Sequence, residues 1–198
     1  NYWMHVGFIN VDGEKMSKSL GNFFTIRDVM DKFHPEVIRY FIVSSHYRSP
    51  VNFSDTALKE AKNTLSRFYH SFKAYQAVYG EKTVETLDET LVERFNTAMR
   101  DDFNTSEAIA VLFEINKELN RAVKDENQEQ ATVYYSTLRH LTNILGLVQY
   151  NVDDFLKSDI GQEALGLTAE QIEDLIQQRK DAKKAKEFAK ADEIRQSL

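Results

Sequence analysis

Apolar residues recur at helical spacing over most of this 198-residue chain. The longest run lies between residues 55 and 80, where spacings of three and four alternate over about six turns. Ser54 stands where an N-cap is needed, and Gly80 stands where a helix can end. The pattern therefore predicts one long helix with a single apolar face. Its positions are Leu58, Ala61, Leu65, Phe68, Phe72, Tyr75 and Tyr79.

Three more helices are predicted between residues 91 and 146. The first is short, from Leu91 to Met99. The second begins where Asn104 and Glu107 form a capping-box arrangement, and the third ends at Gly146. Because these helices and the long one each have one apolar face, and the connections are short, the four are expected to pack as an antiparallel bundle. The apolar positions beyond residue 100 are Ile109, Leu112, Ile115, Leu119, Val123, Tyr134, Leu138, Leu141 and Leu145.

The chain before the bundle begins with a different pattern. Residues 2–11 are rich in aromatic and branched side chains and precede the turn dipeptide Asp12-Gly13. This combination predicts a buried strand that ends in a tight turn. The aromatic residues Tyr2, Trp3 and Phe8 are accordingly expected in the core.

Two helices are expected between this strand and the bundle. Thr25 is placed to cap the first, in which apolar residues recur as far as Phe33. Pro35 breaks and restarts the chain, and a second helix is predicted from Glu36 to Ser45, apolar enough to be mostly buried. Arg39 is the polar exception on this helix. It has two interpretations, a salt bridge with an acidic side chain, which we favour, and a contact with a phosphate.

The pattern weakens after the bundle. Residues 150–167 have no period and are expected to be a linker. Thr168 and Gln171 form another capping-box pair, which predicts a helix with Ile172 and Leu175 on its apolar face. A basic cluster follows, and by itself it is typical of a solvated helix face. Its members are Arg179, Lys180, Lys183, Lys184, Lys186 and Lys190.

Composition excludes several classes of protein. No apolar run reaches the roughly 18 residues that span a bilayer, and the first residues lack the order of a signal peptide, so a cytoplasmic protein without membrane contact is expected. The absence of cysteine excludes disulfides and thiolate metal sites, and the five histidines show no metal-ligand spacing, so no metal is predicted in this chain. A net charge of −6 argues against indiscriminate nucleic-acid binding but leaves room for an RNA held by a local basic strip.

One charged segment stands out between the strand and the first helix. Val11–Asn22 reads VDGEKMSKSLGN and holds four candidate anion ligands, Lys15, Ser17, Lys18 and Ser19. Lysine supplies a mobile point charge, serine a hydroxyl donor, and glycine lets backbone N–H groups approach an anion. A segment of this kind suits a polyphosphate. By composition alone it is also typical of a solvated linker.

The residues KMSKS resemble the second signature of the class I aminoacyl-tRNA synthetases, and VDGEKMSKSLGNFFTIRD resembles the cysteinyl family among them. Two later segments agree with this family in the same order, residues 46–54 (HYRSPVNFS) and residues 101–108 (DDFNTSEA). The resemblance implies a mainly α chain with four parts. These are the end of a catalytic core with the loop and stem-contact helices (1–54), a tRNA-contacting helical bundle (55–149), a linker (150–167) and the start of a truncated anticodon-binding region (168–198).

The same resemblance implies a chemistry. Lys18 would contact the phosphates of ATP, supplied with Mg²⁺, and Lys15, Ser17 and Ser19 would support it. The implied partners are ATP, cysteine and the tRNA for cysteine, and Arg48 would lie near the inner side of that tRNA. The family's HIGH-type signature and its zinc ligands are not among these residues. Zinc is therefore expected in the full-length enzyme but not here, and this chain is expected to be inactive alone.

Two other functions remain open from the sequence. One is a related ligase that joins cysteine to an amino sugar, which shares the loop and the bundle. Residues 179–195 (RKDAKKAKEFAKADEIR) resemble instead the start of the synthetase anticodon region. The other is a non-catalytic tRNA-binding helical module. The intact pair of lysines and serines in the loop speaks against a module that has lost its chemistry.

Overall fold

The computed structural model of the chain describes residue 1, residues 3–158 and residues 169–184. The chain divides into two compact units, Asn1–Ser158 and Asp159–Leu198. In the second unit the described residues form helix α8 (Ala169–Lys184), which confirms a helix there, while its predicted cap Thr168 lies outside the described residues. Lys186 and Lys190 of the basic cluster also lie outside them. None of the described helices combines the length and the apolar character needed to span a bilayer.

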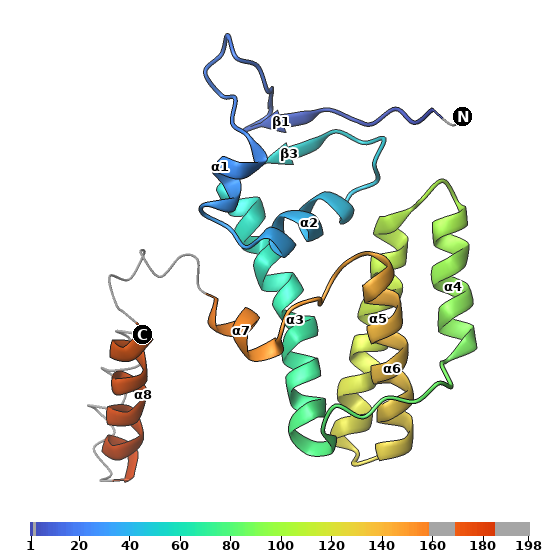
Figure 1. Cartoon of the computed structure of the whole chain (residues 1–198), viewed down its shortest axis with the longest axis vertical. Coiled ribbons are helices and arrows are strands. Elements are labelled where there is room, and N and C mark those ends of the chain that lie inside the picture. Colours follow the sequence, from blue (N-terminus) through green and yellow to red (C-terminus); the bar gives the residue numbers. More distant parts are fainter. Residues whose placement is uncertain (2, 159–168, 185–198) are drawn as a thin grey trace. The chain divides into compact units, whose positions relative to one another are not determined.

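A small three-stranded sheet lies at the start of the first unit (Figure 1). It consists of β1 (Ile9–Val11), β2 (Glu14–Lys15) and β3 (Val51–Phe53), in the order β2-β1-β3. β1 pairs antiparallel with β2 and parallel with β3. The predicted turn is present, since Asp12 and Gly13 have φ angles of 50° and 85°, and positive φ at both central positions fits the right-handed twist of a hairpin.

The predicted strand over residues 2–11 is wrong for most of its length. Only residues 9–11 are a strand, and Trp3 and Phe8 are 91% and 63% exposed rather than buried. A strand preference reports how well side chains pack on a covered surface, and the side chains of Trp3, Met4, Val6 and Phe8 are all exposed. The aromatic composition therefore marked a segment whose side chains are not part of the core, although Gly7 and Phe8 form backbone hydrogen bonds with Tyr47 and Val51. Tyr2 lies outside the described residues.

Two short helices follow the sheet. In α1 (Ile26–Met30) the Thr25 hydroxyl accepts from the Asp28 backbone N–H while the Asp28 carboxylate accepts from Thr25, a complete capping box. α1 ends three residues before the predicted Phe33. α2 (Pro35–Val43) begins one residue before the predicted Glu36, with proline at its first position, and ends two residues before the predicted Ser45.

Four helices make the bundle, and they run alternately down and up in Figure 1. They are α3 (Asp55–Tyr79), α4 (Glu89–Arg100), α5 (Thr105–Lys124) and α6 (Gln128–Ile144). Each begins with a side chain that accepts a backbone N–H from three residues further on, and these caps are Ser54, Asp88, Asn104 and Asn127. The predicted apolar faces form the core, which confirms the mainly α architecture. Fully buried examples are Leu58, Leu65, Phe68, Phe95, Leu112, Leu119, Leu138 and Leu141.

A further helix lies where the sequence predicts only a linker. α7 (Val152–Lys157) starts at Asn151, whose side chain accepts from two backbone N–H groups, and packs on α3. Its Phe155 ring stacks on the Tyr69 ring with centroids 3.8 Å apart. The helix has two buried residues, Val152 and Phe155, one turn apart, too few for a periodic pattern in the sequence.

A buried carboxylate joins the helices at this end of the unit. Glu36 on α2 is 3% exposed, and its oxygens accept hydrogen bonds from the Tyr69 hydroxyl on α3 and, at 2.9 Å, from the Gln149 backbone N–H. Burial raises the pKa of this carboxyl, and the hydrogen bonds oppose that rise. The joint therefore ties α2, α3 and the segment after α6 together.

Candidate phosphate-binding loop

The candidate loop, residues 11–22, is anchored at its base by the hairpin. The Gly13 backbone N–H donates to the Asn52 side-chain oxygen at 2.8 Å, and the Asp12 N–H donates to the Phe53 carbonyl at 3.3 Å. Both acceptors belong to β3. Lys15 ends β2, so the first lysine of the loop stands on a strand whose position the sheet fixes.

The rest of the loop is closed by one asparagine. The Asn22 side-chain oxygen accepts from the Ser17 N–H at 2.8 Å, and its amide nitrogen donates to the Lys15 carbonyl at 3.4 Å. The Ser17 hydroxyl lies 3.2 Å from that of Ser19 and accepts from the Leu20 N–H at 3.3 Å. Asn22 therefore holds the first half of the KMSKS segment, Lys15 to Ser17, against the end of the loop, and the two serines share one small hydrogen-bond network.

The two lysines of the loop lie against aromatic rings. Lys15 Nζ is 4.4 Å from the centroid of the Phe8 ring, and Lys18 Nζ is 5.4 Å from that of Phe23. Such contacts contribute roughly 0.5–1 kcal/mol at exposed sites. Neither lysine forms an ion pair within the described part of the chain. Their ammonium groups are thus held weakly and remain accessible to an anion from solution.

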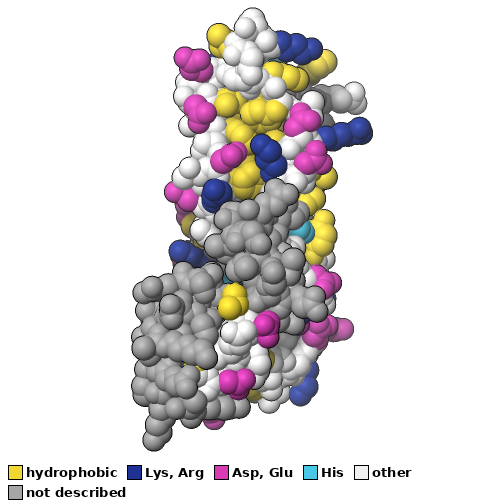
Figure 2. All heavy atoms as spheres, turned by 90° about the vertical axis from the view of Figure 1, so that its left-hand side faces the viewer, with side chains coloured by type: hydrophobic (Ala, Val, Ile, Leu, Met, Phe, Trp, Pro, Cys, Tyr) yellow, Lys and Arg dark blue, Asp and Glu magenta, His cyan; other side chains and the backbone are white. Residues whose placement is uncertain are grey.

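Exposed apolar side chains surround the loop. Leu20, Phe23, Ile26 and Met30 are 61%, 49%, 70% and 41% exposed. Figure 2 shows hydrophobic side chains gathered in the upper part of one face, at the height of the hairpin, with charged side chains at the margins of this patch. The cationic loop therefore stands on an apolar surface.

A second polar cluster connects the loop that precedes β3 with the turn between α4 and α5. The Asp102 carboxylate accepts from the Tyr47 hydroxyl at 2.6 Å and from Arg48 Nε at 2.7 Å, while His46 Nε2 lies 3.1 Å from the Asp102 carbonyl. Asp102 and Phe103 both have a φ of 53°, which is uncommon for residues other than glycine. The cluster could not be predicted from the sequence, although both segments carry the family resemblance, because its partners lie 54 to 56 residues apart.

Arg39 does not form the favoured salt bridge. No ion pair or hydrogen bond of the described residues involves its side chain. Its positive charge acts on Glu36, whose oxygens already accept hydrogen bonds from Tyr69 and Gln149. That prediction is wrong because the one acid nearby on α2 points into the core. Among the described residues, no group of three or more His, Cys, Asp and Glu side chains could hold a metal ion.

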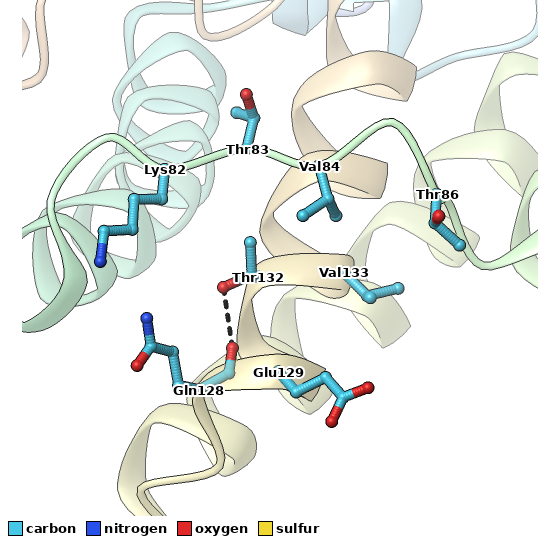
Figure 3. A pocket seen from close by; sticks show the side chains of 8 residues that line it. All are labelled: Lys82, Thr83, Val84, Thr86, Gln128, Glu129, Thr132 and Val133. Carbon is cyan, nitrogen blue, oxygen red and sulfur yellow. Dashed lines mark hydrogen bonds between the residues drawn. The ribbon is translucent and has the colours of Figure 1, made fainter.

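A hollow of about 710 Å³ lies away from the loop, where residues 82–86 cross the start of α6 (Figure 3). Val84 points toward Thr132 and Val133, and the Thr132 hydroxyl donates to the Gln128 carbonyl at 2.8 Å. The Tyr75 hydroxyl also donates to Thr132, at 2.9 Å. These contacts hold the connection on the bundle, and the lining has no nucleophile beside a base, so we assign no chemistry to it.

Two protein-family models match the chain. Residues 1–63 match the catalytic domain of class I (C) tRNA synthetases, and residues 94–149 match the DALR domain. The first match covers the sheet, the candidate loop, α1 and α2. The second covers the later part of the bundle.

Curated relatives match over the whole chain. A cysteine–tRNA ligase of Acinetobacter baumannii (strain SDF) is 83% identical over 198 residues, and one of Acinetobacter baylyi (strain ATCC 33305 / BD413 / ADP1) is 76% identical over the same length. A cysteine–tRNA ligase of Psychrobacter cryohalolentis is 50% identical over 206 aligned positions, which include 99% of this chain. The chain spans 42% of the length of each of these relatives.

The fold is similar to that of a solved synthetase. An Agrobacterium radiobacter K84 LeuRS in a ternary complex with tRNA and LeuAMS matches with a TM-score of 0.57 over 79% of this chain and 22% of its own. At 20% sequence identity this likeness concerns the fold alone. The sequence relatives are far closer, and they agree with the catalytic-domain match. The chain therefore belongs to the cysteine–tRNA ligase family of class I aminoacyl-tRNA synthetases.

Proposed function

We propose that this chain supplies the ATP-phosphate loop and a tRNA-contacting helical bundle to an enzyme that activates cysteine with ATP and transfers it to the tRNA for cysteine. The observation that carries this proposal is a KMSKS loop whose two lysines form no ion pair with a described residue, in a chain 83% identical to a cysteine–tRNA ligase. Lys15, Ser17, Lys18 and Ser19 are the proposed ligands of the ATP phosphates.

The proposed chemistry needs positioned cations. In activation, a carboxylate oxygen of cysteine bonds to the α-phosphorus of ATP, and the bond from that phosphorus to the bridging oxygen breaks. Pyrophosphate then leaves and carries away the growing negative charge. Cations placed along the leaving group stabilise that transition state. Lys18, with Lys15 and Mg²⁺ brought by ATP, would provide them.

The hairpin gives this loop a fixed base and a movable tip. Its base is bonded to β3 through Gly13 and Asp12, while the tip is held mainly by Asn22 and by the ring contacts of the lysines. A loop built in this way can close over ATP and open again without a change in the sheet. The arrangement therefore supports the proposed role of a mobile phosphate clamp.

The division into parts is proposed on the same basis. Residues 1–54 would end the catalytic core, 55–149 would form the tRNA-contacting bundle, 150–167 would link, and 168–198 would begin an anticodon-binding region. The family models at 1–63 and 94–149 support the first two parts. Zinc is assigned to no described residue, and we expect it only in the full-length enzyme.

A chimera tests the proposal. These 198 residues would replace the matching stretch of the Acinetobacter baumannii (strain SDF) ligase, and cysteine-dependent ATP–pyrophosphate exchange and aminoacylation of the tRNA for cysteine would be measured. We expect both activities in the chimera and neither in the isolated chain. A folded chimera without pyrophosphate exchange, or exchange by the isolated chain, would contradict the proposal.

A further inference from the structure

The chain between α2 and β3 connects the helical bundle with the hairpin, and we call residues 46–53 the bridge segment. In Figure 1 it lies between the sheet and the turn that joins α4 to α5. Its side chains contact that turn, since the Asp102 carboxylate accepts from the Tyr47 hydroxyl at 2.6 Å and from Arg48 Nε at 2.7 Å. Its backbone contacts the chain before β1, since the Gly7 N–H donates to the Tyr47 carbonyl at 2.8 Å. Tyr47 therefore takes part in both contacts.

Gly7 fixes the position of the chain before β1 on the bridge segment. A Cβ at Gly7 would lie 2.2 Å from the Ser49 carbonyl oxygen and 2.9 Å from the Pro50 nitrogen. Because these are backbone atoms, no side chain fits at Gly7 unless one of the two chain segments moves. The two backbones are therefore in direct contact, and a displacement of Tyr47 would displace Gly7 as well.

Two contacts continue from the bridge segment to the first lysine of the KMSKS loop. The Val51 N–H donates to the Phe8 carbonyl at 2.9 Å, and the Phe8 ring centroid lies 4.4 Å from Lys15 Nζ. The Asn52 side chain accepts from the Gly13 N–H at 2.8 Å, within the turn of the hairpin. β2 pairs with β1, and β1 pairs with β3. The position of Lys15 on β2 therefore depends on the bridge segment through both the strands and the turn.

The contacts of Asp102 are better suited to set a position than to stabilise the fold. The side chains of Asp102 and Arg48 are 45% and 63% exposed, and ion pairs at such exposure contribute little to stability. The guanidinium nevertheless holds both carboxylate oxygens, with Nη2 3.2 Å from Oδ1 and Nε 2.7 Å from Oδ2, and a bidentate pair of this kind fixes orientation. Asp102 and Phe103 also have a φ of 53°, a conformation that persists where surrounding contacts hold it.

We propose that Asp102 is a positioning residue for the KMSKS loop, and that it sets the place of the Lys15 ammonium group through Tyr47 and Gly7. The inference rests on the proposed function, in which Lys15 is a ligand of the ATP phosphates. It adds to that function a residue of the helical bundle on which cysteine activation depends even when no tRNA is present.

The test is cysteine-dependent ATP–pyrophosphate exchange by the chimera without tRNA, with kcat and KM for ATP measured separately. Asp102→Ala is expected to lower kcat roughly tenfold and to change KM for ATP less than about twofold, because the leaving pyrophosphate needs the positioned cation most in the transition state. Tyr47→Phe keeps the ring and the charge of Asp102 and removes only the hydroxyl, so it should reproduce most of this loss. The double variant should lose no more than Asp102→Ala alone, since both residues act in one chain of contacts.

Glu114→Gln is the matched control. Glu114 on α5 forms a bidentate pair with Arg94 on α4, at 2.5 and 2.9 Å, and this pair is about as exposed as that of Asp102 but lies outside the bridge segment. The variant should exchange at the wild-type rate. When Lys15→Ala is already present, Asp102→Ala should lower kcat by less than about twofold more, because the group that it positions is gone.

A second readout uses the 198-residue chain labelled with ¹⁵N-glycine, which reports on seven glycines. In Asp102→Ala and in Tyr47→Phe, the amide signals of Gly7 and Gly13 should shift, because these N–H groups donate to the bridge segment. The signal of Gly80, at the C-terminal end of α3, should stay and would verify that the fold is kept.

The inference is overturned if the Gly7 and Gly13 signals do not move in these variants. It is also overturned if Lys15→Ala lowers exchange while Asp102→Ala and Tyr47→Phe keep the wild-type kcat, and either result leaves the proposed function intact. A wild-type chimera without exchange would contradict the proposed function instead. The glycine signals of the isolated chain would then still show whether Asp102 positions the hairpin.

Discussion

Arg48 Nε lies 2.7 Å from Asp102 Oδ2, across 54 residues of chain. Tyr47 donates its hydroxyl to the same carboxylate at 2.6 Å, and Arg48 Nε also lies 2.9 Å from that hydroxyl. These hydrogen bonds, from Tyr47 first and Arg48 second, hold the pKa of Asp102 below its usual value of 3.8. The contact fastens the segment before β3 to the turn between α4 and α5.

Asp102→Asn should weaken the contact between these two segments without unfolding the first unit. Asparagine keeps the shape of the side chain and removes the charge that Arg48 holds. We expect faster amide hydrogen exchange over residues 46–50 and 102–104, with little change in global stability because the pair is exposed. Asp101→Asn is the control, since the Asp101 side chain forms no hydrogen bond with a described residue. Equal amide hydrogen exchange in both variants would indicate that the ion pair does not stabilise these two segments.

Glu36→Gln should change how stability depends on pH. Burial raises the pKa of Glu36 above 4.5, so between pH 4.5 and the raised value the folded state binds more protons than the unfolded state. The stability that this group contributes is therefore present below pH 4.5 and is lost as pH rises through the folded pKa. Urea unfolding followed by circular dichroism should show this loss in the wild type and a flatter profile in Glu36→Gln. Glu129→Gln, at an exposed position, should keep the wild-type profile.

Phe155→Ala should strongly destabilise the first unit. Phe155 is 3% exposed and stacks on Tyr69, so its removal leaves a cavity between α7 and α3. Truncation of a buried phenylalanine costs about 3–5 kcal/mol of unfolding free energy. Asp153→Ala on the same helix breaks only the exposed pair with Lys73 and should have a small effect. Similar unfolding midpoints for the two variants would mean that α7 is not packed as described.

Asn22→Ala should open the KMSKS loop. The variant loses the acceptor of the Ser17 N–H and the donor to the Lys15 carbonyl. Limited trypsin digestion should then cut faster after Lys15 and Lys18, and mass spectrometry would identify the cleavage sites. Asn22→Asp keeps the acceptor that makes the 2.8 Å bond and should resist cleavage nearly as well as the wild type. Unchanged cleavage of Asn22→Ala would show that another contact closes the loop.

Lys18→Ala in the chimera should reduce ATP–pyrophosphate exchange about 10²- to 10³-fold, the usual effect of removing one positioned donor from a transition state. Lys32→Ala removes a positive charge from the segment after α1 and should keep nearly full exchange. The comparison separates a specific contact from a general loss of positive charge. Equal rates for the two variants would count against Lys18 as a phosphate ligand.

The helices of the bundle could be predicted from sequence because their stability lies in periodic apolar faces and local caps. Leu58, Leu65 and Leu112 stand at spacings that a reader of the sequence can count, and Ser54 and Asn104 cap helices within three residues of themselves. Both signals are local. Apolar periodicity and helix caps can therefore be recognised in the sequence without knowledge of the tertiary contacts.

The features that could not be predicted depend on contacts between residues that are far apart in the sequence. Trp3 and Phe8 look like core residues in any window of sequence, but burial needs an element to cover them. Glu36 carried one usable signal, an acid placed among the apolar residues of α2, yet its partners Tyr69 and Gln149 lie 33 and 113 residues away. Asp102 likewise finds its partners only through the fold. Of the candidate loop, the residue types were evident from sequence, but its closure by Asn22 was not.

The parallel pairing of β1 with β3 has a mechanical consequence. β3 leads directly into the cap of α3, a helix of 25 residues that at 1.5 Å per residue is about 37 Å long. The base of the loop and the near end of this rod share one set of backbone hydrogen bonds. A tilt of α3 by about 5° at its N-terminal end would move its C-terminal end by about 3 Å. A small displacement of the hairpin would therefore become a larger displacement at the far end of the bundle.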